Sequence, residues 1–272
     1  MAYDHSWQSI FSPGSGADFF HDARPAGFAV DADGFNPINA WWLSELSRLI
    51  YRRDAAEGIG RPLRPSRNDF LGRVGLVERR FFNGAVVQAA LVETVRGGDN
   101  AYAVLVFRGT SGRLSNWLFN LDMVACPWPS GGAVHRGFKN SLESIWDAIA
   151  PVLERVRRPL FFTGHSLGGA LATLGASLHP PRAVYAFGAP RVGDAAFARS
   201  LAGVPVYNVF NPKDIVPGLP PSGPWSRFTH AGTIFNNSEM NPDQRTPGQA
   251  PAFLAGHAPL NYSAQLPAVF DN

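Results

Sequence analysis

The sequence predicts an α/β fold whose central sheet is mostly parallel, because short apolar runs alternate along the chain with longer stretches of helical character. The apolar runs have the length of strands buried on both faces, and they occupy residues 101–107, 160–162, 183–187 and 204–210. The stretches of helical character lie between them, at residues 138–156, 167–178 and 194–202. We expect these segments to form βαβ units, with helices flanking the sheet.

The 272 residues are expected to form one domain over residues 1–272. Hydrophobic residues make up 45% and charged residues 17%, and no long polar tract divides the chain. Residues 1–36 are rich in Gly, Pro, Asp and aromatics without periodicity, so we expect an irregular N-terminal arm lying on the domain. Asn36 and Pro37 then signal a helix start, because Asn is a favoured cap and Pro suits the first helical position. We expect that helix to end near Arg53.

A β-hairpin is expected before the first buried strand. Residues 77–82 and 85–92 have strand character, and Asn83-Gly84 separates them. This dipeptide favours a two-residue type I′ turn.

Charge and cysteine content exclude several classes of protein. The net charge is +3 and the basic residues are scattered, which is a poor signature for a nucleic-acid partner. The nearest approach to a basic run is residues 48–67, and we expect it to be ordinary solvated surface. Cys126 is the only cysteine, so neither an intrachain disulfide nor a Cys-based zinc site can form.

No membrane-spanning or secretory segment is expected. No stretch approaches the roughly 18 consecutive apolar residues of a transmembrane helix. The N-terminus carries Asp4 and lacks an apolar run of signal-peptide length. We therefore expect a soluble protein, either cytoplasmic or exported by a route that uses no classical signal peptide.

Residues 164–168, Gly-His-Ser-Leu-Gly, lie between an apolar strand and a helix start rich in small residues. That context is typical of a nucleophile elbow, a sharp strand-to-helix turn that holds its serine in a strained conformation. Gly164 and Gly168 flank Ser166 where a side chain would collide across the turn. The free N–H groups of the helix start lie where an oxyanion would form. The motif predicts the α/β-hydrolase fold, with Ser166 as the nucleophile.

Chain order selects an acid and a base, because in this fold the acid and then the histidine follow the serine. Asp214 follows an apolar strand by four residues, whereas Asp194 stands at a helix start and is better explained as a cap. Two histidines remain as candidates for the base, His257 and His230. We favour His257, in a Gly/Ala loop before the last amphipathic stretch. We expect His230 to be structural, with a hydrogen bond to a neighbouring backbone group.

Four blocks of the sequence resemble the class 3 lipase family, which includes the filamentous-fungal triacylglycerol lipases. These blocks are residues 106–110, 134–138, 163–170 and 211–221. The arm before residue 36 has no clear counterpart. His135 lies in one of the blocks but precedes the nucleophile, so we expect it to be structural.

The resemblance implies that Ser166, Asp214 and His257 match the family triad. It also implies that Thr110 matches the Ser/Thr oxyanion residue and that the Leu167 N–H is the second donor. In the resulting mechanism the histidine activates the serine, an acyl-enzyme forms, and water hydrolyses it. That mechanism requires no metal or organic cofactor.

A candidate lid covers about residues 112–124. Four apolar side chains fall at i, i+3, i+4 and i+7 of a short helix: Leu114, Trp117, Leu118 and Leu121. By resemblance this helix is the family's lid, which covers the acyl pocket in water. The alternative is a fixed helix docked on the core.

The sequence thus predicts an ester hydrolase acting on lipid esters at an interface, most similar to a triacylglycerol lipase. A phospholipase A1 and a short-chain or feruloyl-type esterase remain open as alternatives. A different class is a catalytically silent member that binds only lipid or a protein partner. The presence of all the triad residues and of Thr110 argues against that class. The oligomeric state is left open.

Overall fold

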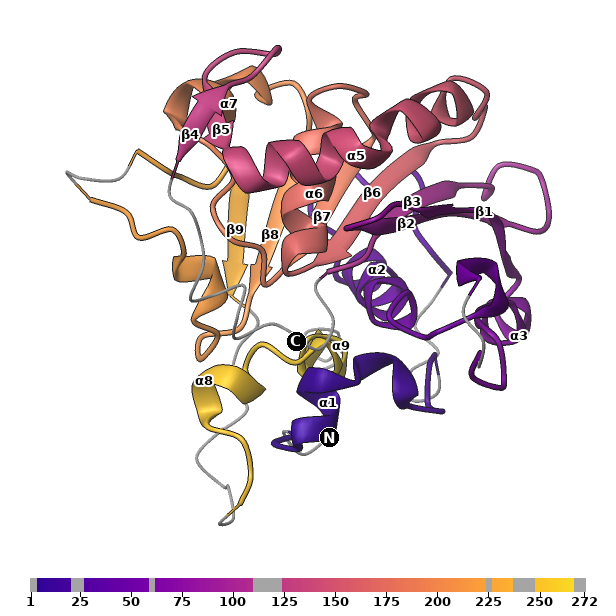
Figure 1. The fold of residues 1–272 in the computed structure, drawn as a ribbon. Coiled ribbons are helices and arrows are strands. Elements are labelled where there is room, and N and C mark those ends of the chain that lie inside the picture. Colours follow the sequence, from indigo (N-terminus) through magenta and orange to yellow (C-terminus); the bar gives the residue numbers. More distant parts are fainter. Residues whose placement is uncertain are drawn as a thin grey trace.

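The structure, a computed structural model, describes residues 4–20, 27–58, 62–109, 124–223, 227–236 and 248–266. Within these residues a seven-stranded sheet forms the centre, in the order β1-β2-β3-β6-β7-β8-β9 (Figure 1). The strands are β1 Leu76–Asn83, β2 Gln88–Thr94, β3 Ala103–Phe107, β6 Leu160–His165, β7 Ala183–Phe187, β8 Val206–Phe210 and β9 Thr233–Asn236. From β3 onward every neighbouring pair is parallel, whereas β1–β2 and β2–β3 are antiparallel. The expected mostly parallel sheet is confirmed.

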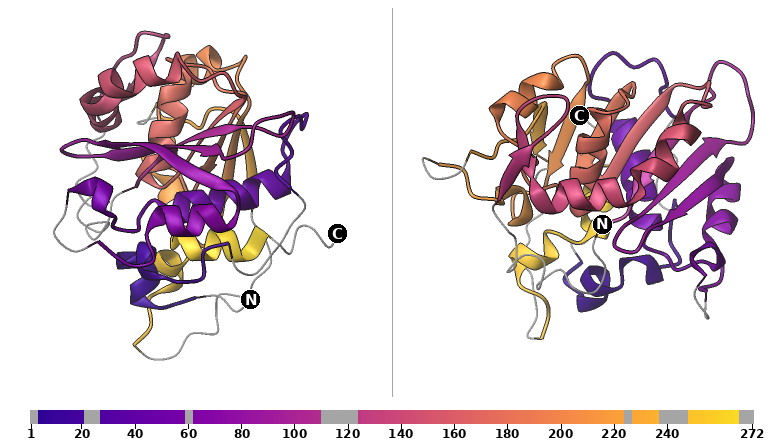
Figure 2. Two further views of the ribbon diagram at one scale, coloured as in Figure 1. Left: turned by 90° about the vertical axis from the view of Figure 1, so that its right-hand side faces the viewer. Right: turned by 45° about the horizontal axis from the view of Figure 1, so that its top comes forward.

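Helices cover both faces of the sheet, as the edge-on view shows (Figure 2). The helices are α1 Trp7–Phe11, α2 Pro37–Leu49, α3 Arg67–Arg73, α5 Arg136–Leu153, α6 Leu167–Ala176, α7 Ala195–Ser200, α8 Ala252–Ala255 and α9 Pro259–Gln265. On one face α5 and α6 bury Phe138, Leu142 and Leu171 against the sheet. On the other face α2 and α9 bury Leu43 and Tyr262. A separate two-stranded ribbon, β4 Ala125–Pro127 with β5 Ala133–His135, precedes α5.

The start of α2 follows the expected capping chemistry. The Asn36 side chain accepts a hydrogen bond from the Asn39 N–H at 3.0 Å, and Pro37 is the first helical residue. The α-helix ends at Leu49, four residues before the expected end near Arg53.

The hairpin before β3 forms, but the two-residue type I′ turn was wrong. Asn83 pairs with Gln88, so the loop has four residues, and the Gly84 N–H donates to the Val87 carbonyl at 3.0 Å. Val87 is only 2% exposed and joins the core, which shortens β2 at its start. Glycine is needed at position 84 because a side chain there would overlap Ile145 of α5.

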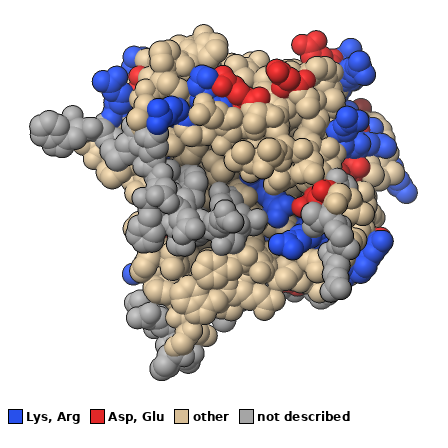
Figure 3. All heavy atoms as spheres, in the orientation of Figure 1, with Lys and Arg blue, Asp and Glu red and all other residues tan. Residues whose placement is uncertain are grey.

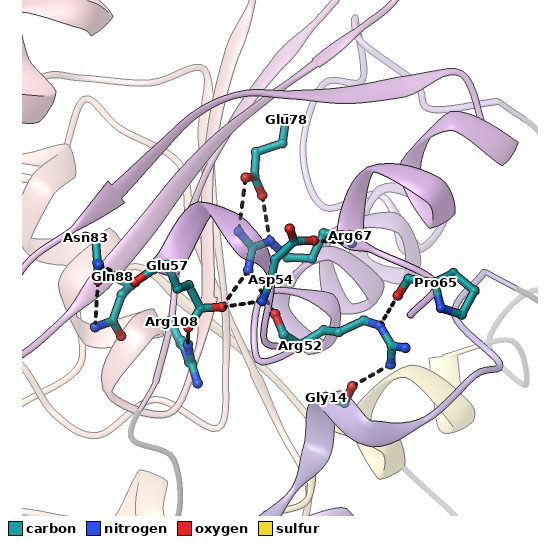
Figure 4. A network of polar contacts seen from close by, with 10 residues as sticks. All are labelled: Gly14, Arg52, Asp54, Glu57, Pro65, Arg67, Glu78, Asn83, Gln88 and Arg108. Carbon is teal, nitrogen blue, oxygen red and sulfur yellow. Dashed lines mark hydrogen bonds and ion pairs between the residues drawn. The ribbon is translucent and has the colours of Figure 1, made fainter. Parts of the chain in front are cut away.

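The expectation that residues 48–67 are ordinary solvated surface was wrong for three of the arginines, whereas Arg53 and Arg64 are exposed as expected. Arg48, Arg52 and Arg67 are 3%, 3% and 2% exposed. Arg67 donates to Glu78 at 2.7 Å and to Glu57 at 2.8 Å, and the cluster appears in Figure 4. Buried charges persist when they are paired and hydrogen-bonded. The basic run therefore has a structural role inside the molecule.

The N-terminal arm is less irregular than expected, because it contains α1 and the 3₁₀ turn Pro13–Ser15. Two buried arginines hold the arm in place: Arg48 in α2 and Arg52 just after the end of α2. Arg52 donates to the carbonyl oxygens of Gly14 and Gly16, both at 2.9 Å, and Arg48 pairs with Asp18 at 3.0 Å. The arm is therefore attached to the layer of α2 at Gly14, Gly16 and Asp18.

Among the described residues, no helix combines the length and apolar character needed to cross a membrane.

Candidate active site

Ser166 occupies the turn between β6, which ends at His165, and α6, which begins at Leu167. Its backbone has φ +59° and ψ −128°, a conformation that non-glycine residues adopt rarely and at a cost. The Ser166 N–H donates to the Phe187 carbonyl of the neighbouring strand at 2.9 Å, which anchors the turn. This is the strained strand-to-helix elbow that the motif predicts.

The glycines of the motif allow the backbone to pass close to itself. A Cβ atom at Gly164 would overlap the backbone of Gly168, and one at Gly168 would overlap the carbonyl of Phe107 in β3. A side chain at either position would therefore push α6 away from the sheet. The spacing of the glycines around Ser166 follows from this contact.

The structure brings Ser166, His257 and Asp214 together from three separate parts of the chain. His257 Nε2 lies 2.9 Å from Ser166 Oγ, and His257 Nδ1 lies 2.7 Å from Asp214 Oδ2. His257 stands in the loop between α8 and α9, and Asp214 follows the end of β8. Both distances lie within the reach required for a nucleophile, a base and an orienting acid.

The rival residues lie elsewhere, in the structural roles expected for them. His230 Nε2 contacts the Pro217 carbonyl at 2.9 Å, and Asp194 caps α7 by accepting from the Phe197 N–H at 2.9 Å. His135 caps α5, because its Nδ1 accepts from the Gly137 N–H at 3.1 Å.

Tyr262 of α9 holds the carboxylate of Asp214, a role that sequence reasoning missed. Its hydroxyl donates to Asp214 Oδ2 at 2.7 Å and accepts from the Asn211 N–H at 3.1 Å. The other carboxylate oxygen accepts from the Val216 N–H at 2.8 Å. The Asp214 side chain is fully buried, so these donors replace water around its charge. The only signal in the sequence was an aromatic residue soon after His257.

Tyr262→Phe should therefore lower kcat about tenfold with little change in KM. The substitution removes one hydrogen bond to a buried carboxylate, and such a bond contributes roughly 1.5–3 kcal/mol. Steady-state kinetics on a soluble ester, with Tyr207→Phe on the same face of the sheet as a matched control, checks this. Equal kcat in wild type and Tyr262→Phe would contradict the positioning role.

His165, inside the motif, lies beside the ring of His257 with the ring centroids 4.5 Å apart. Its Nδ1 is 3.1 Å from the Tyr51 hydroxyl of the α2 end. Burial holds the pKa of His165 well below its ordinary value, and the nearby His257 lowers that pKa further. His165 is therefore neutral, so it adds no positive charge where His257 would become an imidazolium.

The N-terminal arm lines the cavity at Ser166, which the sequence did not indicate. Ile10 and Pro13 of the arm face this cavity together with Tyr51 and Pro259. A wider cleft of about 310 Å³ adjoins it on the far side of Pro13 and Tyr51, and Phe11 and Arg108 are among its lining residues.

Two parts of the expected site lie outside the described residues: Thr110 and the candidate lid with Leu114, Trp117, Leu118 and Leu121. Gly109, just before Thr110, lies against the elbow, because a Cβ atom there would stand 2.6 Å from the His165 carbonyl oxygen. Leu167 is the first residue of α6, where N–H groups have no partner within the helix. The end of β3 and the start of α6 are therefore neighbours at the nucleophile.

Acid should destabilise the fold through His230. The pKa of His230 is lowered from 6.5 to about 4, mainly by burial and also by the charge of Arg191, while the contact with the Pro217 carbonyl opposes the shift. The unfolded chain therefore takes up a proton that the folded chain does not bind until about pH 4. This contribution is fully present above pH 6.5 and is lost as the pH falls toward about 4. It amounts to roughly 3 kcal/mol.

Urea unfolding at several pH values between 7 and 4 checks this, with His230→Asn as the comparison. The variant should lose stability less steeply than wild type over that window, with some loss remaining because the pKa of His165 is also lowered. Parallel curves for the two proteins would contradict the assignment.

Among the residues that the structure describes, no group of three or more His, Cys, Asp or Glu side chains could hold a metal ion. The residues around Ser166 supply a nucleophile, a base and an orienting acid.

Comparison with known proteins agrees with the geometry. Residues 104–223 match the family model for lipase (class 3). The lipase of Rhizomucor miehei is 36% identical over 166 residues, which cover 54% of this chain and 45% of that protein. The secreted mono- and diacylglycerol lipase 1 of Fusarium solani is 34% identical over 160 residues, which cover 51% of this chain and 48% of that protein. In these alignments the chain spans about half the length of each curated relative.

A solved triacylglycerol lipase, whose catalytic centre is described as formed by a serine protease triad, has the same fold. It superposes with a TM-score of 0.54 at 28% identity, over 69% of this chain and 79% of that chain. The matched segment of this chain contains β3, the elbow at Ser166 and Asp214. The expected α/β-hydrolase fold is confirmed, and the resemblance to the class 3 lipase family is confirmed over residues 104–223.

Proposed function

We propose that this chain hydrolyses the carboxylic esters of lipids, with triacylglycerol-like esters as the substrate class. The observation that carries the proposal is the chain of contacts from Asp214 Oδ2 to His257 Nδ1 at 2.7 Å and from His257 Nε2 to Ser166 Oγ at 2.9 Å. The names of the relatives support lipid esters as the substrate, because they are lipases and acylglycerol lipases.

The reaction follows from these contacts. Ser166 Oγ attacks the ester carbonyl while its proton passes to His257 Nε2. Asp214 holds the tautomer of the imidazole and stabilises the imidazolium. The leaving alcohol takes the proton from His257 as the acyl-enzyme forms. A water molecule then gives its proton to the same nitrogen and attacks the acyl group, which releases the acid and restores Ser166.

The oxyanion is proposed to lie between the Leu167 N–H and Thr110. The N-terminus of α6 points N–H groups and the positive end of its dipole at this position. Thr110 follows Gly109, which lies against the elbow, and this adjacency in sequence supports Thr110 as the second donor. The candidate lid over residues 112–124 remains part of the proposal, with its apolar stripe covering the acyl site in water.

Thr110→Val should lower kcat by roughly 10²–10³, because it removes the hydroxyl donor and keeps the backbone N–H. Thr110→Ser should be nearly harmless, since it keeps both donors. Single-turnover kinetics on a chromogenic ester measures the acylation step directly. Wild-type acylation in the valine variant would remove Thr110 from the oxyanion site.

The substrate class is tested by a hydrolysis profile over ester chain length, taken below and above the solubility of each ester. We expect the rate on long-chain acylglycerols to rise more steeply than saturation kinetics allows once a lipid phase forms. Preference for soluble short-chain esters at every concentration would instead identify an esterase. Release of fatty acid from phospholipid but not from acylglycerol would identify a phospholipase.

A further inference from the structure

All three exposed aromatic side chains among the described residues lie on two short neighbouring helices, α1 and α8. Trp7 is 42% exposed, Phe11 is 40% exposed and Phe253 is 49% exposed. Large apolar side chains that remain exposed together mark a surface that meets another apolar body. We call these three rings the aromatic face.

The packing of the two helices turns these rings outward. Ile10 of α1 is buried in a small cluster with Ala250, Ala255 and Ala258, which joins α1 to the region of α8. Trp7 and Phe11 of the same helix stay exposed, and their rings are stacked with centroids 5.6 Å apart.

The indole nitrogen of Trp7 already has a hydrogen-bond partner within the protein. Its indole N–H donates to the Gly248 carbonyl at 2.9 Å. The ring can therefore leave water without losing a hydrogen bond, which is what entry into an apolar phase requires.

The charge pattern identifies the kind of partner. Residues 5–17 and 248–266, which build this side of the molecule, contain no Asp, Glu, Lys or Arg. Figure 3 shows the surface over α1 free of charged atoms, with Lys, Arg, Asp and Glu gathered on the upper and right-hand parts. A protein that docks on anionic headgroups uses basic residues, and these two segments contain none; the nearest basic side chains, Arg53 and Arg108, line the cleft beside Phe11. The face fits an uncharged, apolar lipid phase.

A second copy of the chain fits less well. Three rings of 150–250 Å² each, about half exposed, offer roughly 300 Å² of contact area. A stable protein interface needs about 800 Å² per partner.

The aromatic face is continuous with the catalytic site. Ile10, between Trp7 and Phe11 in sequence, lines the cavity at Ser166 and His257, and Phe11 lines the adjoining 310 Å³ cleft. A lipid surface in contact with Phe11 would therefore lie beside the cleft that shares Pro13 and Tyr51 with the catalytic cavity. We propose that Trp7, Phe11 and Phe253 dock the enzyme on a neutral lipid surface, a proposal that rests on the proposed lipid-ester hydrolysis.

The test measures binding without catalysis. In the Ser166→Ala chain, flotation with triolein droplets gives the fraction of protein bound as a function of droplet surface. We compare that chain with the same chain carrying Trp7→Ser, Phe11→Ser and Phe253→Ser. Val86→Ser is the matched control, because Val86 is 69% exposed on the β1–β2 loop and belongs to neither α1 nor α8. Near-ultraviolet circular dichroism and the melting temperature report folding.

The affinity of the triple variant for droplets should fall by about a hundredfold or more, and that of Phe253→Ser by about tenfold. The loss follows from the apolar area that each variant removes. Phe253→Ser keeps the test valid if the triple variant does not fold. Val86→Ser should bind like the parent. High salt should not weaken binding, because no charge is involved.

Droplet binding that survives in both ring variants overturns the proposal, as does a parent that does not bind. Binding that salt abolishes overturns it in favour of charge-driven docking. A parent dimer that the triple variant splits without changing droplet binding would show that the face joins two copies. Failure of the proposed catalytic function is distinguishable, because it is seen as absence of hydrolysis of a water-soluble ester by the wild-type chain.

Discussion

Ser166→Ala should reduce kcat about 10⁶-fold, which is the usual effect of deleting the nucleophile of a triad. The substitution removes the hydroxyl oxygen that lies 2.9 Å from His257 Nε2 and leaves a methyl group in place of the hydroxymethyl group. The backbone hydrogen bond from the Ser166 N–H to the Phe187 carbonyl remains, so the elbow should keep its shape. Steady-state kinetics on a chromogenic ester, with the melting temperature as the folding control, measures the loss.

Ser166→Gly is a second test of Ser166 as the nucleophile. It also removes the nucleophile, but glycine tolerates the φ of +59° that serine adopts at a cost. The glycine variant should therefore be as inactive as the alanine variant and no less stable than it. Substantial residual turnover in either purified variant would move the nucleophile elsewhere.

His257→Ala should be similarly severe, with a loss of kcat of about 10⁶. Without the imidazole, no group within reach of Ser166 Oγ among the described residues can accept its proton, because the neighbouring His165 is turned to Tyr51. Removing the ring also leaves the buried carboxylate of Asp214 without its 2.7 Å partner, so some loss of stability should accompany the loss of rate.

The matched control is His230→Ala. His230 was the rival base, and its ring contacts the Pro217 carbonyl rather than Asp214. Its replacement should lower stability and leave kcat within a few-fold of wild type. Severe inactivation of a folded His230→Ala protein, with activity retained in His257→Ala, would show that His230 is the general base.

Local signals were sufficient for much of the fold and for the triad geometry. The apolar runs identified the strands because those strands are buried on both faces, and their order then fixed the direction of each βαβ unit. The elbow at Ser166 could be recognised because its glycines are required by close backbone contacts, both within the motif itself and with β3. Chain order, which reflects the topology of the sheet, limited the acid and the base to a few candidates, and local context then favoured Asp214 and His257.

Features that depend on distant partners could not be read from the sequence. The burial of Arg52 and Arg67 depends on Gly14, Glu57 and Glu78, which come from other parts of the chain. The hydrogen bond from Tyr262 to Asp214 depends on where α9 docks.

The turn after Asn83 and the N-terminal arm show the same limit. Asn83-Gly84 favours a two-residue turn locally. Val87, however, is buried in the core instead of pairing in β2, so the loop has four residues. The arm carries no periodic pattern, and its place beside Ser166 is set by the arginines of α2 that hold it.

Intact mass spectrometry and peptide mapping after reaction with a fluorophosphonate test the central claim most directly, because such reagents trap an activated serine. The account predicts one adduct per chain on the peptide containing Ser166. It also predicts strong suppression of labelling in His257→Ala and no labelling in Ser166→Ala. A folded wild-type chain that takes up no reagent, or that carries it on a different serine, would contradict the account.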